Sequence, residues 1–143
     1  RRIGSMILSP EVTTRTTELE NEAGRLGNLI GMFGAAVERL LRKYQQEILD
    51  RQYLQARIAD AACELYASSC VLSRLDAIVR DHHLSEDQKR RDLKLGRYYL
   101  ATADRRARQC LEDLWDNDDD ETTVVADAVL AWQQAGLLQP PCP

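Results

Sequence analysis

The segment LQARIADAACELYASSCVLSRLDAIV, residues 54–79, decides the fold of this chain. Apolar or small side chains recur along it in steps of four and three residues, the spacing that forms one continuous face of an α-helix. The members of this face are Leu54, Ile58, Ala61, Leu65, Ser68, Leu72, Leu75 and Val79. No charged residue lies between Glu64 and Arg74, which is typical of a helix that is buried on several sides. We therefore expect one long central helix here.

The opposite side of this helix carries a second row of small side chains. Its members are Ala56, Ala59, Cys63, Ala67, Cys70 and Ala77. Because short side chains let a neighbouring helix approach closely, we interpret the part from Ala56 to Cys70 as a candidate docking face. Tyr66 and Ser73 lie beside it and could hydrogen-bond either to a partner or within the interior.

The composition indicates a single all-α domain. The chain has 143 residues, and its prolines are confined to Pro10 and the last four residues. Few aromatic or β-branched runs alternate in the manner of strands. A net charge of −4 argues against a protein that binds duplex nucleic acid and against general attraction to anionic lipid. The chain begins with Arg1 instead of an initiator Met, so we expect it to be a piece of a longer protein.

The four cysteines suggest a reducing intracellular compartment. They are Cys63, Cys70, Cys110 and Cys142, and they form no CxxC pair. The first three fall inside predicted helices, where we expect small buried thiols. No signal peptide is evident, and no stretch approaches the roughly 20 apolar residues that a membrane span needs.

A first long helix follows a lead-in segment, residues 1–17. Its expected inward side is Leu19, Ala23, Leu26, Ile30, Phe33, Val37, Leu40 and Tyr44. The unusual feature is a glycine stripe along one side of the helix, formed by Gly24, Gly27, Gly31 and Gly34. Each glycine costs about 1 kcal/mol of helix propensity relative to alanine. We interpret the stripe as a second candidate docking face that lets a backbone come close, from this chain, a second copy or a neighbouring domain; the alternative is a weak or kinked helix.

A third helix begins at a capping box, Ser85 to Gln88, and carries a basic stripe along one flank. The stripe consists of Arg90, Lys94, Arg97, Arg105 and Arg108. Such a row could hold the phosphates of a ligand such as CoA or lipid headgroups. We favour the other interpretation, a solvated face whose charges pair with acids of neighbouring helices.

A shorter fourth helix should complete an up-down-up-down four-helix bundle over residues 18–138. Its expected inward side is Val125, Ala128, Val129, Trp132 and Ala135, and Gly136 reads as its stop signal. Residues 139–143 are expected to form an extended tail. Adjacent His82 and His83 have no further ligands in view, and no ExxH pair occurs, so we predict no metal, catalytic or cofactor residue in this chain.

Three segments of the central helix carry a family resemblance. They are Gln52–Asp60 with its Arg-Ile-Ala-Asp step, Leu65–Ala67 with a Leu-Tyr pair, and Val71–Arg74 with its Val-Leu-Ser-Arg step. In this order and spacing they resemble the C-terminal extension of the very-long-chain type of acyl-CoA dehydrogenase. Weaker likenesses occur at Pro10–Val12 near the start and at Gly136–Leu138 near the end.

The resemblance implies a helical bundle appended to a flavin-binding dehydrogenase module of fatty-acid β-oxidation. The FAD contacts and the catalytic Glu of such enzymes belong to the upstream module, so this part should be catalytically silent. The family implies packing on its own catalytic module, self-association into an oligomer and, in mitochondrial members, membrane or partner contact. Its location would be cytoplasmic in a bacterium and mitochondrial in a eukaryote. The alternative is a stand-alone helical adaptor that self-associates through the glycine stripe.

Overall fold

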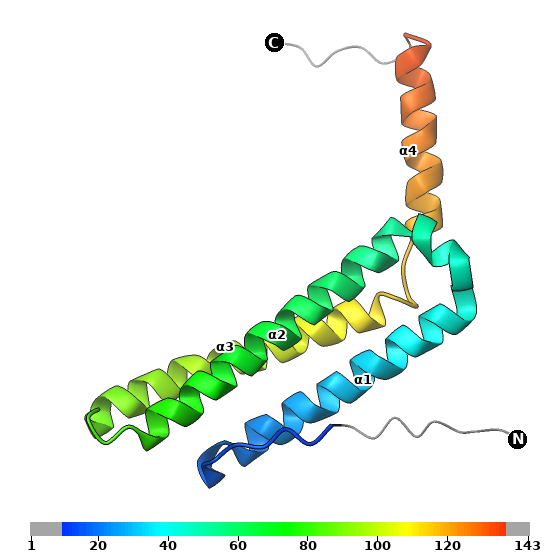
Figure 1. Ribbon diagram of the computed structural model, residues 1–143. Coiled ribbons are helices and arrows are strands. Elements are labelled where there is room, and N and C mark those ends of the chain that lie inside the picture. Colours follow the sequence, from blue (N-terminus) through cyan, green and yellow to red (C-terminus); the bar gives the residue numbers. More distant parts are fainter. Residues whose placement is uncertain (1–9, 137–143) are drawn as a thin grey trace, which may run out of the picture.

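The computed structural model describes residues 10–136, which contain four α-helices and two short 3-10 helices but no strand. The elements are η1 (Thr17–Leu19), α1 (Glu20–Tyr44), η2 (Gln45–Asp50), α2 (Gln52–Arg80), α3 (Glu86–Glu112) and α4 (Asp119–Gln134). Helices α1, α2 and α3 lie along one another as a bundle, and α4 projects from one end of it (Figure 1). The all-α helical bundle is therefore confirmed. The predicted tail, residues 139–143, and most of the lead-in lie outside the described residues.

Helix α2 is the centre of the bundle, and its first face forms the core. Six of the eight predicted members are buried: Leu54, Ala61, Leu65, Ser68, Leu72 and Leu75. Ile58 and Val79 are half-buried and pack against them. Helix α3 comes close to α2 at Gly96, where an added Cβ would lie 2.6 Å from the methyl carbons of Leu75. The hydrophobic pattern of α2 thus fixes how both neighbouring helices pack.

The predicted capping box at the start of α3 is present. The Ser85 hydroxyl accepts a hydrogen bond from the Gln88 backbone N–H at 3.3 Å, and the Gln88 side chain accepts one from the Ser85 backbone N–H at 2.9 Å. These bonds satisfy amide groups that a helix start leaves without partners. At the other end of the bundle, Gln45 ends α1 with a positive φ of 47° and η2 turns the chain into α2.

The ordered part of the lead-in, residues 10–16, runs back along α1 and is anchored by a buried carboxylate of α2 (Figure 1). Asp76 Oδ1 accepts hydrogen bonds from the backbone N–H groups of Arg15 and Thr16 and from the Thr16 hydroxyl, each at 3.0 Å. Burial by itself raises the pKa of Asp76, but these bonds and the charge of Arg80 outweigh it and leave the pKa below the usual 3.8. Asp76 therefore ties the start of α1 to the end of α2.

The fourth helix differs from the expectation that it packs on the bundle. Val125 is 62% exposed and Trp132 51% exposed, and no residue of α4 is buried. Its first turn is held instead by Arg57 of α2, whose two guanidinium nitrogens donate to Asp119 at 2.6 and 2.7 Å. The expected inward side was wrong because, between Val124 and Trp132, apolar residues lie on nearly all sides of the helix, so this part of the sequence defines no single stripe that faces the bundle.

Replacing Asp76 with alanine should lower the free energy of unfolding by about 2–3 kcal/mol, because three donors lose a charged acceptor. The stabilisation should be complete above the ordinary aspartate pKa and should be lost as pH falls through the lowered pKa of the folded state. Urea unfolding of wild type and Asp76→Ala across acidic pH measures both effects. Asp60→Ala, at an exposed position of the same helix, is the control and should change stability little. Equal effects of the two variants would contradict the anchoring role.

Two glycines of α1 should respond to alanine in opposite directions. An added Cβ at Gly24 meets nothing within 4 Å, so Gly24→Ala should raise stability by about 1 kcal/mol through helix propensity alone. At Gly27 the Cβ would lie 2.6 Å from the Pro10 carbonyl oxygen, so Gly27→Ala must displace the lead-in and should lower stability by about 1 kcal/mol or more. Thermal and urea unfolding of both variants decides this, and the same gain at both sites would argue against the close backbone contact.

Candidate functional site

The second face of α2 is open to solvent along the middle of the helix. We call it the outer face of α2, and its residues are Ala56, Ala59, Cys63, Tyr66, Ala67 and Cys70. Five of these are exposed and Ala67 is half-buried. Tyr66 is the most prominent side chain, with 74% of its surface exposed. The outer face is thus a shallow strip of small and apolar groups about 20 Å long, the length of four helical turns.

Ion pairs border this strip on the side toward α3 and α4. Arg106 of α3 donates to both carboxylate oxygens of Glu64 at 2.6 and 2.8 Å, and Arg57 holds Asp119 at the start of α4. The hydrogen bond from Arg57 lowers the pKa of Asp119, so this pair stays charged. Two ion pairs therefore lie along this edge of the strip, whereas Asp60, between Arg57 and Glu64 on the same helix, is exposed.

The structure places the helical cysteines differently from the expectation. Cys63 and Cys70 were expected to be buried, but both are exposed, because they lie on the outer face and not on the core side of α2. Cys110 is half-buried. Burial first, and then the nearby carboxylates of Asp60, Asp113 and Glu64, raise the pKa of the Cys110 thiol.

The glycine stripe of α1 is only partly open. Gly24 is exposed, Gly27 and Gly31 are buried, and Gly34 is half-buried. The neighbour of Gly27 is the backbone of the same chain, since the Pro10 carbonyl lies where a Cβ would be. At this position the close backbone approach is made by the lead-in segment.

The basic stripe of α3 lies largely among acids of its own chain. Arg90 pairs with Asp87 at 3.5 Å, and Arg108 pairs with Asp104 at 2.9 Å. Arg97 reaches across to α1, where it pairs with Glu22 at 2.8 Å. In residues 10–136, Lys94 and Arg105 form no ion pair. Three of the five basic side chains that could hold a phosphate are therefore already paired with carboxylates of the same chain.

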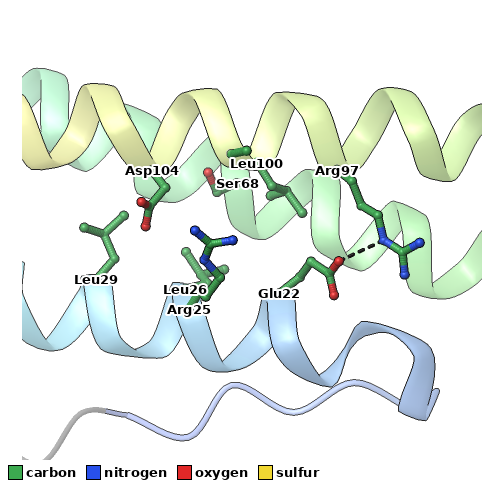
Figure 2. A pocket seen from close by; sticks show the side chains of 9 residues that line it. Glu22, Arg25, Leu26, Leu29, Ser68, Arg97, Leu100 and Asp104 are labelled. Atoms are coloured by element: carbon green, nitrogen blue, oxygen red, sulfur yellow. Dashed lines mark hydrogen bonds and ion pairs between the residues drawn. The ribbon is translucent and has the colours of Figure 1, made fainter.

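A cavity that the sequence did not suggest lies between α1 and α3 and has a volume of about 130 Å³ (Figure 2). Its apolar wall consists of Leu26, Leu29, Leu100 and Ala101. Glu22 points into it: Oε1 binds Arg97, whereas Oε2 is buried and has no hydrogen-bond partner among the described residues. Periodicity could not reveal this site, because it depends on how far apart α1 and α3 lie.

Residues 10–136 hold no group of three or more His, Cys, Asp or Glu side chains that could bind a metal ion. No helix among them is both long enough and apolar enough to cross a bilayer. His82 and His83 are exposed in the turn between α2 and α3.

Comparison with known proteins gives a consistent result. The family model described as the ACAD9/ACADV C-terminal domain matches residues 17–134. The chain is 35% identical over 86 residues to the mitochondrial very long-chain specific acyl-CoA dehydrogenase of Macaca fascicularis, which covers 59% of this chain and 12% of that protein. The protein of the same name from Bos taurus is 35% identical over 69 residues, 46% of this chain and 10% of its own length. The chain thus matches only a small part of each relative. No solved structure matches it.

The exposure of the outer face predicts a pattern of thiol reactivity. In a Cys142→Ser background, Cys63 and Cys70 should react readily with a disulfide reagent, and Cys110 should react about tenfold more slowly because it is half-buried and has a raised pKa. The rate at Cys110 should keep rising into alkaline pH as its thiol ionises. Peptide mapping of the labelled chain measures each site. Equal rates at all three cysteines would contradict the described placement of α2.

Proposed function

This chain belongs to the ACAD9/ACADV C-terminal domain family, and we propose that it is a non-catalytic accessory domain of a flavin-dependent acyl-CoA dehydrogenase. The family model spans α1 to α4, so the whole described bundle corresponds to the appended domain of such enzymes. The oxidation of acyl-CoA and the FAD that it requires belong, in this proposal, to a catalytic module elsewhere in the parent protein. The relatives are mitochondrial by name, and we propose the same location if the parent is eukaryotic.

The outer face of α2 is the surface that we propose for docking on the catalytic module. The observation that carries this is a strip of small apolar side chains, including Cys63 and Cys70, left exposed on the central helix. The part of this strip beyond Glu64 lies in a stretch without charged residues up to Arg74, and an exposed apolar surface of this kind is typical of a contact with a partner. The paired charges at its edge, Glu64 with Arg106, would form the polar rim of such an interface.

The alternative of a stand-alone adaptor that self-associates through the glycine stripe has less support. Gly27, in the middle of the stripe, already contacts the Pro10 carbonyl of the same chain. The basic stripe likewise offers little to a phosphate ligand, because Arg90, Arg97 and Arg108 are paired with acids. Contacts within the chain therefore occupy Gly27 of the glycine stripe and three of the five residues of the basic stripe.

A charge placed on the outer face tests the docking role in the parent enzyme. Cys63→Glu should change the stability of the isolated chain little, because the site is exposed there. In the parent enzyme the same substitution should weaken the contact between the bundle and the catalytic module, because a carboxylate would be buried there without a partner. Limited proteolysis between the two parts, with flavin content and acyl-CoA oxidation as readouts, measures the effect.

Leu95→Glu is the matched control, since Leu95 is 63% exposed on α3 and lies outside the outer face of α2. It should leave the parent enzyme as resistant to proteolysis as wild type. Equal loosening by both variants would reject the outer face as the docking surface. An isolated chain that binds FAD or oxidises acyl-CoA would reject the accessory role itself.

A further inference from the structure

The cavity between α1 and α3 has a lining of both apolar and polar side chains (Figure 2). The polar and charged members of the lining are Glu22, Arg25, Ser68, Arg97 and Asp104. Its volume of about 130 Å³ is below the roughly 150 Å³ of a cavity that holds benzene, so an occupant has no more than about six non-hydrogen atoms. The cavity therefore suits an occupant that is both small and polar.

Two carboxylates of the lining are held in place by arginines of α3. Arg97 Nε donates a hydrogen bond to Glu22 Oε1 at 2.8 Å. The Asp104 carboxylate accepts two hydrogen bonds from the Arg108 guanidinium, at 2.9 and 3.2 Å. These contacts fix the positions of Glu22 and Asp104 at the cavity, and they leave one oxygen of Glu22 without a donor.

Three polar groups around this space have no partner in the described part of the chain. Glu22 Oε2 is buried and accepts no hydrogen bond there. Ser68 of α2 is only 4% exposed, and its hydroxyl forms no hydrogen bond within residues 10–136. Arg25, exposed at the rim, forms no ion pair within the same residues. Because a buried polar group without a partner is costly, these groups indicate a polar occupant.

Water by itself meets this demand poorly. The cavity has room for several waters, each of which needs about two to four polar partners. The apolar wall formed by Leu26, Leu29 and Leu100 supplies none of them. One molecule with a polar group at each end and a short carbon link between them can satisfy the three unpartnered groups and still contact the apolar wall.

We propose that the cavity between α1 and α3 binds the zwitterion of a small α-amino acid, glycine or alanine. The ligand carboxylate accepts from the Arg25 guanidinium, and its ammonium group donates to Glu22 Oε2 and to the Ser68 hydroxyl. Glu22 and Arg25 lie three residues apart on α1, so their Cβ atoms are about 5–6 Å apart and both reach a molecule whose charged groups flank one carbon. The site is separate from the outer face of α2, so the inference goes beyond the proposed function.

Titration of the isotope-labelled chain with glycine, followed through its amide NMR shifts, tests the site. We expect saturation in roughly the millimolar range, because a ligand with so few atoms gains limited binding energy. The largest shifts should lie around Glu22, Ser68 and Ala101. Acetate lacks the ammonium group and should bind about tenfold more weakly or worse, since the bonds to Glu22 and Ser68 are lost. Leucine should not bind, because its side chain exceeds the space available.

Four variants test the roles of the individual side chains. Glu22→Gln removes the charge that faces the ammonium group, and Arg25→Ala removes the partner of the carboxylate; each should weaken glycine binding about tenfold. Ala101→Leu should fill the cavity and abolish binding. Arg42→Ala, at an exposed position of α1 outside the cavity, is the control and should leave the affinity unchanged. Circular dichroism of each variant should show unchanged helix content.

Shifts that rise linearly with glycine concentration and spread over the whole surface would mean that the cavity holds only water, and this would overturn the proposal. Equal affinities for glycine and acetate would overturn it too, as would saturable binding that Arg25→Ala leaves unchanged. None of these results bears on the outer face of α2, which is tested separately in the parent enzyme.

Discussion

The burial of one continuous face of α2 is the constraint on which the rest of the structure depends. From Leu54 to Leu75 this face lies in the core, and α1 and α3 both pack against it. Because it turns inward, the row of small side chains on the opposite side must turn outward. The same helix therefore builds the bundle and presents the surface proposed for docking, and neither property can be changed without affecting the other.

The two ends of the bundle are held by charged groups in different ways. At one end, buried Asp76 anchors the lead-in through three hydrogen bonds, and Gly27 gives the Pro10 carbonyl room to pass. At the other, the pair of Arg57 with Asp119 sets the direction of α4. The first arrangement covers Gly27 of the glycine stripe with the chain itself, whereas the second leaves the apolar side chains of α4 exposed. Both are local electrostatic contacts that decide which surfaces remain available to partners.

Periodicity predicted the three long helices, the core face of α2 and the capping box at Ser85, because these depend on neighbours within one helix. It failed for α4, whose apolar residues between Val124 and Trp132 lie on nearly all sides of the helix. It also failed for Cys63 and Cys70, because the burial of these side chains depends on the positions of the other helices. The cavity beside Glu22 was missed for the same reason, since it arises from the spacing between α1 and α3. The family resemblance located in α2 agrees with the match over residues 17–134, whereas the docking faces stay predictions.

Hydroxyl-radical footprinting of the parent enzyme tests most directly whether α2 is a helix with two covered faces. Tyr66 on the outer face of α2 and Tyr98 on α3 are equally exposed in this chain, at 74% and 72%. They should therefore be oxidised at similar rates in the isolated chain. Within the parent enzyme, our account predicts strong protection of Tyr66 and continued oxidation of Tyr98. Tyr66 oxidised as fast in the parent enzyme as in the isolated chain would contradict it.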